Sequence, residues 1–377
     1  MSKVKLGDVA IEHKETCKGS KDGYPIVGLE HLVSEEVTLT AWDEGNDNTF
    51  TKMFRKGNVL FGRRRAYLKK AAVAPFDGIC SGDITVIEAI PDRILPELLP
   101  FIIQNDELFD FAVGKSAGSL SPRVKWEHLK NYEFELPDMD KQRELAELLW
   151  AMDATKKSYQ KLIAATDELV KSQFMEQFVI EAPYERTRLG DHISQIRGVS
   201  YKPADLRPSL SEESVLLLRA NNIGAGRINH DEVQYVAKEK VSTVQLIRAG
   251  DILMCASSGS LEHVGKAAIC LPSIEGETFG AFCKLIRPKG DLLPEYIAAY
   301  FETDEYREII MQLACGSNIN NLKAEHIDEL QIPTPPAEVQ EAFVSFLRQS
   351  DKSKFELEQA LSELTATYKR IIAKNLG

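Results

Sequence analysis

A long amphipathic helix pattern occurs twice in the chain, and it restricts the possible folds more than any other feature. In the second copy, alternating steps of four and three residues select Phe343, Leu347, Ser350, Lys354, Leu357, Leu361, Leu364, Tyr368 and Ile371. The same steps earlier in the chain select Leu145, Leu149, Met152, Lys156, Tyr159, Ile163, Thr166, Val170 and Gln173. Neither stretch contains Gly or Pro, so each predicts one unbroken helix of roughly 60 Å. Because each helix ends a globular segment, mutual pairing is favoured over ordinary core packing.

Composition limits the class of protein. The chain has 377 residues, of which 44% are hydrophobic and 27% charged, as in a globular protein of two or three domains. It contains no apolar run on the order of 18 residues and no apolar signal region, so we expect no membrane contact and a cytoplasmic location. A net charge of −11 argues against nonspecific polyanion binding but allows a local basic face. The six cysteines are scattered, which predicts neither structural zinc nor disulfides.

The globular parts also repeat. Short motifs recur in the same order: Leu6-Gly7-Asp8 as Leu189-Gly190-Asp191, Leu95-Pro96-Glu97 as Leu293-Pro294-Glu295, Gly118-Ser119 as Gly316-Ser317, and Glu127-His128-Leu129 as Glu325-His326-Ile327. The predicted segments are a first globular domain (1–137), a first long helix (138–182), a second globular domain (183–336) and a second long helix (337–377).

Each globular part combines strands and helices. Apolar runs predict strands at 24–29, 59–61 and 84–87 in the first copy, and at 215–218, 252–255 and 282–286 in the second. Pro96 and Pro294 are expected in the first turns of helices that run to about residues 113 and 313. The predicted fold class is α+β, with two repeated mixed α/β domains separated by two long antiparallel helices that form a coiled-coil spacer.

The motif order, together with Ile332-Pro333-Thr334-Pro335-Pro336-Ala337-Glu338-Val339-Gln340 before the second helix, resembles the specificity (S) subunit of Type I restriction–modification systems. The resemblance covers essentially the whole chain. It implies two target-recognition domains that read the two halves of a split site in double-stranded DNA. It also implies that the helices act as a spacer and dock two methyltransferase subunits, beside restriction subunits. Catalysis, including adenine methylation with S-adenosylmethionine, would then belong to those partners, and this chain would be non-catalytic and without a cofactor.

The residues themselves give little support to an enzyme. The segment Gly259–Ala267 resembles a phosphate-binding loop, but it has one residue too many between the glycines and Ala267 in place of Ser or Thr. The histidines show no metal-ligand spacing. His128 and His326 are equivalent by repeat, and a helix-cap or hydrogen-bonding role is favoured over catalysis because no partner groups accompany them.

Two loops in the first copy have residues suited to DNA. Arginine matches guanine and asparagine matches adenine, whereas lysine, serine and threonine mainly contact phosphates. The loop after the 59–61 strand carries three consecutive arginines, although a solvated charge run or pairing with acidic groups would give the same pattern. The candidate DNA contacts in the first copy are Arg63, Arg64, Arg65, Tyr67, Lys69, Ser119, Arg123 and Lys125.

The corresponding loops of the second copy have a different composition. The loop at 256–266 is small and polar, as expected where backbone approaches a duplex closely. The loop at 316–323 is rich in asparagine, which fits either adenine readout or Asx turns. The candidates in these loops are Ser257, Ser258, Ser260, Lys266, Asn318, Asn320, Asn321 and Lys323. Arg219, Asn221 and Asn222 follow the 215–218 strand and are further candidates, with the same choice between base contact and turn formation. Since the loops differ while the scaffold repeats, we expect the two domains to read different sequences.

The long helices carry more apolar side chains than one seam uses. These additional residues are Leu148, Leu162, Leu169 and Phe174 in the first helix, and Phe346, Phe355 and Ile372 in the second. Leu162, Phe174, Phe346 and Phe355 are the candidate methyltransferase contacts, with packing against the chain's own domains as the alternative. The competing function is a protein-binding scaffold, which would show no sequence-selective affinity for duplex DNA.

Overall fold

The computed structural model describes residues 2–44, 49–180, 184–224, 226–314 and 320–377. The chain forms two compact units: unit 1 is Met1–Lys161 with Leu357–Gly377, and unit 2 is Leu162–Glu356. Each unit therefore contains one end of each long helix, so the units do not coincide with the four predicted segments. Within the described ranges, no helix has the length and apolarity needed to cross a membrane.

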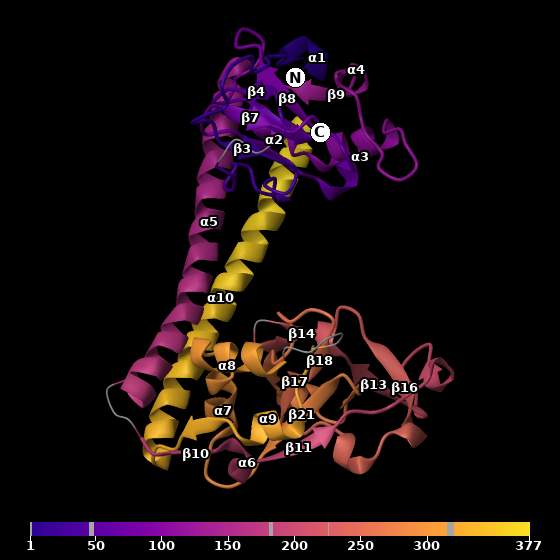
Figure 1. The fold of residues 1–377 in the computed structure, drawn as a ribbon. Helices are drawn as coiled ribbons and strands as arrows, with labels where there is room; N and C mark the ends of the chain where they lie inside the picture. Colours follow the sequence, from indigo (N-terminus) through magenta and orange to yellow (C-terminus); the bar gives the residue numbers. More distant parts are fainter. Residues whose placement is uncertain (1, 45–48, 181–183, 225, 315–319) are drawn as a thin grey trace. The chain divides into compact units, whose positions relative to one another are not determined.

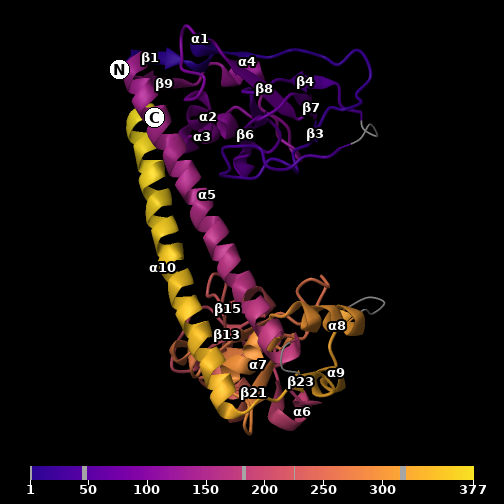
Figure 2. The same ribbon diagram turned by 90° about the vertical axis from the view of Figure 1, so that its left-hand side faces the viewer.

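The two long helices form where the heptad pattern predicts them. Helix α5 spans Met139–Met175 and continues as a π-helical turn over Glu176–Ile180, and α10 spans Ala337–Leu376. All residues of the predicted stripes are buried or half-buried. In unit 2, Asp167 of α5 pairs with Lys354 of α10, and Phe174 packs on Phe343. Positions rise along α5 as they fall along α10, so the helices are antiparallel there (Figure 1; Figure 2).

Unit 1 is built on a four-stranded antiparallel sheet. Its strand order is β2 (Ala10–Glu12), β8 (Ile84–Ala89), β5 (Val59–Gly62) and β6 (Ala71–Val73). A smaller sheet has the order β3 (Ile26–Val27), β7 (Gly78–Cys80) and β4 (Lys52–Phe54), and β1 (Ser2–Lys5) pairs with β9 (Glu133–Leu136). Phe61 on β5 stacks on Phe109 at 5.4 Å between ring centroids, in the buried core.

Unit 2 repeats this arrangement. Its main sheet has the order β11 (Ile193–Arg197), β21 (Cys283–Pro288), β17 (Ile252–Cys255) and β19 (Ala267–Ile269). The second sheet has the order β12 (Leu206–Arg207), β16 (Gln234–Ala237), β13 (Ser214–Leu218) and β20 (Thr278–Phe279). Three two-stranded pairs complete the unit: β10 (Arg186–Arg188) with β23 (Gln331–Pro333), β14 (Ile223–Gly224) with β15 (Arg227–Ile228), and β18 (Ser257–Ser258) with β22 (Asn320–Asn321), as far as the described residues show. The same strand order in both main sheets confirms the internal duplication.

The predicted first turn is confirmed at Pro294, which begins α7, whereas Pro96 lies before α2. The single helix predicted after each Leu-Pro-Glu motif is wrong, because the structure contains two helices in each place. Unit 1 has α2 (Leu99–Ile103) and α3 (Asp106–Gly114), and unit 2 has α7 (Pro294–Tyr300) and α8 (Asp304–Ala314). The side chain of Asn105 accepts from the backbone N–H of Glu107 at 3.2 Å, and that of Thr303 accepts from Tyr306 at 3.2 Å. These N-caps start the second helix of each pair. The short helices are α1 (Leu6–Val9), α4 (Trp126–Leu129), α6 (Leu189–His192) and α9 (Ala324–Asp328).

A buried glutamine fixes the start of each long helix. Gln142 Oε1 accepts from the backbone N–H of Leu95 at 2.8 Å, and its Nε2 donates to the Pro137 carbonyl at 2.8 Å. Gln340 makes the equivalent bonds to Leu293 at 2.9 Å and to Pro335 at 2.9 Å. The glutamine repeat visible in the sequence therefore joins the first turn of each helix to the chain segment before α2 or α7.

Candidate nucleic-acid interface

The two candidate DNA loops of unit 1 lie against each other. The backbone of Arg64 pairs with that of Arg123 in an isolated antiparallel bridge. The N–H of Arg65 donates to the Pro122 carbonyl at 2.8 Å, and the N–H of Val124 donates to the Arg63 carbonyl at 3.0 Å. The loop that follows β5 therefore forms one surface with the loop of residues 115–125, which contains Gly118-Ser119 and is called the Gly-Ser loop below.

Asp83, directly before β8, joins the two loops of unit 1 through their side chains. Arg123 Nε donates to Asp83 Oδ1 at 2.7 Å, and Arg64 Nη1 donates to Oδ2 at 3.3 Å. Arg64 Nη2 also donates to Ser121 Oγ at 3.1 Å. These bonds, first from Arg123 and then from Arg64, hold the pKa of the Asp83 carboxyl below its usual range. Arg64 and Arg123 are thus paired with an acid. For Arg64, this pairing is the alternative interpretation of the charge run.

The other candidates of unit 1 differ in exposure. Arg65 and Tyr67 are exposed, and Arg65 has a left-handed φ of 54°. Arg63 is half-buried, and its Nε is buried without a hydrogen-bond partner. Lys69 forms an ion pair with Asp106 at 2.5 Å. Ser119 and Lys125 are exposed residues of the Gly-Ser loop.

The two loops of unit 2 pair in the same way. Strand β18 (Ser257–Ser258) is antiparallel to β22 (Asn320–Asn321), with Ser257 opposite Asn321. The N–H of Leu322 donates to the Ala256 carbonyl at 2.8 Å, which matches the bond from Val124 to Arg63 in unit 1. The candidate Asn318 lies outside the described residues. In both units, therefore, the loop after the central strand pairs with the loop that precedes α4 or α9. The amino-acid composition of these loops differs between the two units.

Helix α8 holds the first loop of unit 2 in place. The Arg307 guanidinium donates to the carbonyls of Val264 at 2.5 Å and of Leu261 at 2.9 Å. The Tyr306 hydroxyl donates to the Gly265 carbonyl at 2.8 Å, at a residue whose φ of 80° suits glycine. Sequence reasoning missed Arg307 and Asp83, since neither lies in a candidate loop, and only their charges beside the loops could have drawn attention to them.

The remaining candidates of the 256–266 and 316–323 loops whose side chains the structure describes differ in exposure. Ser260, Lys266, Asn321 and Lys323 are exposed, and Lys323 lies 3.2 Å from the carboxylate of Glu325. Ser258 is half-buried, and its hydroxyl accepts from the backbone N–H of Ser260 at 3.2 Å. That bond stabilises a local turn, so Ser258 helps to shape the loop, and its side chain is only partly exposed to solvent.

The prediction that Asn222 contacts DNA is wrong. Its side chain is fully buried, and its Oδ1 accepts from the backbone N–H of Arg219 at 2.9 Å. The residue therefore forms the Asx turn that was the alternative. Arg219 donates to the Glu232 carbonyl at 2.9 Å and is half-buried, whereas Asn221 is exposed.

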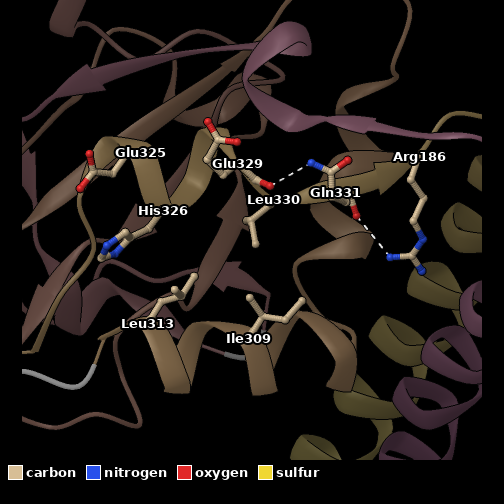
Figure 3. A pocket seen from close by; sticks show the side chains of 8 residues that line it. All are labelled: Arg186, Ile309, Leu313, Glu325, His326, Glu329, Leu330 and Gln331. Carbon is tan, nitrogen blue, oxygen red and sulfur yellow. Dashed lines mark hydrogen bonds between the residues drawn. The ribbon is translucent and has the colours of Figure 1, made fainter.

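A hollow of about 560 Å³ lies between α8 and α9 of unit 2 (Figure 3). It is lined by Arg186, Ile309, Leu313, Glu325, His326, Glu329, Leu330 and Gln331. His326 Nδ1 is buried and has no hydrogen-bond partner, so the expected hydrogen-bonding role is not seen at this atom. Figure 3 shows the ring between Glu325 and Leu313, with no hydrogen bond drawn to either carboxylate. The hollow therefore presents a mostly apolar wall and no bonded acid–base pair among its lining residues.

The long helices expose only part of the predicted partner surface. The prediction that Phe174 is a partner contact is wrong, because only 1% of the residue is accessible. Its ring centroid lies 5.2 Å from that of Tyr296 in the core of unit 2. Ile372 is buried in unit 1, and Phe346 is half-buried against the core of unit 2. Leu162 and Phe355, both in unit 2, are 51% and 54% exposed. Those two remain candidate partner contacts.

Comparison with known proteins identifies the family. Residues 1–165 and 219–365 match the family described as Type I restriction modification DNA specificity domain. The specificity subunits of the Type I restriction enzymes StySPI from Salmonella potsdam and EcoKI from Escherichia coli K12 are 38% and 37% identical over 168 residues. Each of these alignments covers 44% of this chain and 36% of the relative. The MjaVIII specificity subunit from Methanocaldococcus jannaschii is 20% identical over 90% of this chain and 79% of that protein.

Solved structures agree on the fold. One solved structure concerns complex assembly and conformational transition of the type I R-M system, and a chain from it superposes with a TM-score of 0.59. It is 19% identical, over 99% of this chain and 97% of its own length. The Type-I restriction-modification S subunit from M. genitalium has a TM-score of 0.57 at 12% identity, over 100% and 96% of the two chains. With both repeated segments matched, the chain belongs to the Type I restriction modification DNA specificity domain family.

Proposed function

We propose that this chain is the DNA-recognition subunit of a Type I restriction–modification complex, with each unit reading one half of a split target. The observation that carries the proposal is the pairing of two polar loops in both units: Arg64 with Arg123 in unit 1, and Ser257 with Asn321 in unit 2. A repeated scaffold that carries different loops suits the reading of two different sequences. The names of the related specificity subunits support the same assignment.

The proposed partners follow from that role. Two methyltransferase subunits would bind the chain, with Leu162 and Phe355 among the contacts, and restriction subunits would join them. Adenine methylation with S-adenosylmethionine would then take place on the methyltransferase subunits, and this chain would contribute recognition without catalysis. We expect it to act in the cytoplasm, where its DNA and its partner subunits would meet.

Methylome sequencing tests the proposal. Cells that express the chain with its cognate methyltransferase subunit should acquire methylated adenines within one bipartite motif, whose halves are separated by a fixed gap of unspecified bases. A matched culture with the methyltransferase alone should lack that motif. If both cultures have the same methylation pattern, the chain does not direct recognition, and a protein-binding scaffold becomes the better account.

A further inference from the structure

Phe282 in unit 2 occupies the position that Asp83 occupies in unit 1. In the central sheets, Gly62 lies opposite Ile84, and Cys255 lies opposite Cys283. Asp83 directly precedes Ile84, and Phe282 directly precedes Cys283. The carbonyl of Asp83 accepts from the N–H of Arg63 at 3.0 Å. The carbonyl of Phe282 accepts from the N–H groups of Ala256 at 2.9 Å and Ser257 at 3.0 Å.

The side chains at this shared position behave differently. The Asp83 carboxylate accepts hydrogen bonds from Arg64 and Arg123, so its partners lie within unit 1. The Phe282 ring is 67% exposed, although β21 begins at the next residue and Cys283 is fully buried. A single exposed apolar side chain is common on protein surfaces. Here, however, the residue adjoins the strand pair that carries the candidate contacts of unit 2, because its carbonyl accepts from the N–H of Ser257 on β18.

The backbone around Phe282 is well fixed. Its carbonyl accepts two hydrogen bonds from the first loop, and the N–H of Cys283 donates to the Gly280 carbonyl at 2.9 Å. The adjoining pairs, Ser257 with Asn321 and Ser258 with Asn320, form β18 and β22. An aromatic ring on a rigid turn loses little conformational freedom on binding, so its contact area favours association.

We propose that Phe282 is a base-contacting residue for the second half-site, with its ring packed against bases of the target. In a duplex, aromatic side chains contact thymine methyl groups or insert as a wedge between base steps, and neither contact needs a charge. Unit 1 has no equivalent, because Asp83 fills that position and is bonded to two arginines. This inference rests on the proposed DNA-recognition function and assigns a residue to its second half-site.

The test compares Phe282→Ala with wild type in purified complexes with the methyltransferase subunit. The probes are a duplex with the bipartite motif found by methylome sequencing and the same duplex with its second half scrambled. Phe282→Ala should weaken binding to the intact duplex about tenfold and leave binding to the scrambled duplex unchanged. Because no charge is lost, the dependence of affinity on salt should stay the same. Phe282→Tyr, which keeps the ring, should retain most of the affinity.

Leu210→Ala is the matched control. Leu210 is 62% exposed and precedes β13, whereas Phe279 and the turn with Phe282 lie at the other end of that strand. The control should bind like wild type, and all variants should show the wild-type thermal transition. Equal losses on intact and scrambled duplexes, wild-type binding by Phe282→Ala, or loss of the methyltransferase from the complex would each overturn the inference. If the wild-type complex itself does not distinguish the duplexes, the proposed function fails instead.

Discussion

Arg123 and Asp83 are joined by a hydrogen bond of 2.7 Å from Nε to Oδ1, and this bond links the Gly-Ser loop of unit 1 to the strand that follows Asp83. Arg64 approaches the same carboxylate from the other loop at 3.3 Å. One acid thus holds both loops of the candidate interface. Its removal should release two arginines and loosen their shared surface.

Asp83→Asn should therefore lower stability in a pH-dependent manner. Since the folded state holds the Asp83 pKa below its ordinary value, the stabilisation is present above about pH 4 and is lost as the pH falls through the lower folded pKa. The arginines are partly exposed, so we expect a loss of about 1 kcal/mol or less at pH 7. Urea unfolding at pH 7 and at successively lower pH should show the difference between variant and wild type shrinking. A difference that grows as the pH falls would contradict this assignment.

Gln142→Ala and Gln340→Ala should each destabilise the chain. Either change removes the acceptor of the partly buried N–H of Leu95 or Leu293 and the donor to the buried carbonyl of Pro137 or Pro335, at a cost of about 1–3 kcal/mol. Gln349→Ala is the control, because Gln349 is on α10 but exposed. Thermal unfolding of the three variants measures the effect. Equal stability of Gln340→Ala and Gln349→Ala would show that the repeated glutamine is not a structural cap.

The ion pair between Lys354 and Asp167 predicts an asymmetry between two substitutions. Lys354 is 7% exposed in the helix seam, and its Nζ lies 2.5 Å from Asp167. Asp167→Asn leaves a largely buried ammonium without its partner and should cost about 1–3 kcal/mol, whereas Lys354→Met replaces the charge with an apolar chain of similar length and should cost less. Chemical denaturation of the single variants and the double variant measures both effects. A larger loss for Lys354→Met would contradict this explanation.

Simultaneous Leu162→Gln and Phe355→Gln substitutions should prevent co-purification of the methyltransferase. Both side chains are about half exposed in unit 2, so folding should be unaffected while an apolar contact area is lost. Leu210→Gln is the control at a comparably exposed site away from the helices. Size-exclusion chromatography of the co-expressed subunits gives the result. Full assembly of the double variant would remove both residues from the interface.

Much of the fold follows from local pattern. The heptad stripes predict α5 and α10, and the apolar runs predict the central strands, because both depend on burial of one face or one short segment. The division of each predicted helix at Asn105 and Thr303 was missed, since it depends on side-chain caps inside a continuous helical pattern. The burial of Phe174 was missed because it depends on Tyr296, which is remote in sequence.

The candidate site could be predicted only in part. Loop composition identified the segments that carry Arg64, Arg123, Ser257 and Asn321, but their pairing is a long-range backbone contact without a local signal. For Asn222, the choice between turn formation and base contact likewise depends on burial, which is seen only in the structure. The distinction between paired and accessible side chains therefore required the structure.

The central claim is that each unit reads its own half-site, and methylome sequencing of Arg65→Ala and Asn321→Ala variants tests it most directly. Arg65 is exposed in unit 1, and Asn321 is exposed in unit 2. Each variant is co-expressed with the methyltransferase subunit, and its methylated motif is compared with that of wild type. Arg65→Ala should relax positions only in the first half of the motif, and Asn321→Ala only in the second, because a lost base contact of about 1–3 kcal/mol acts locally. Relaxation of both halves by either variant would contradict independent reading by the two units.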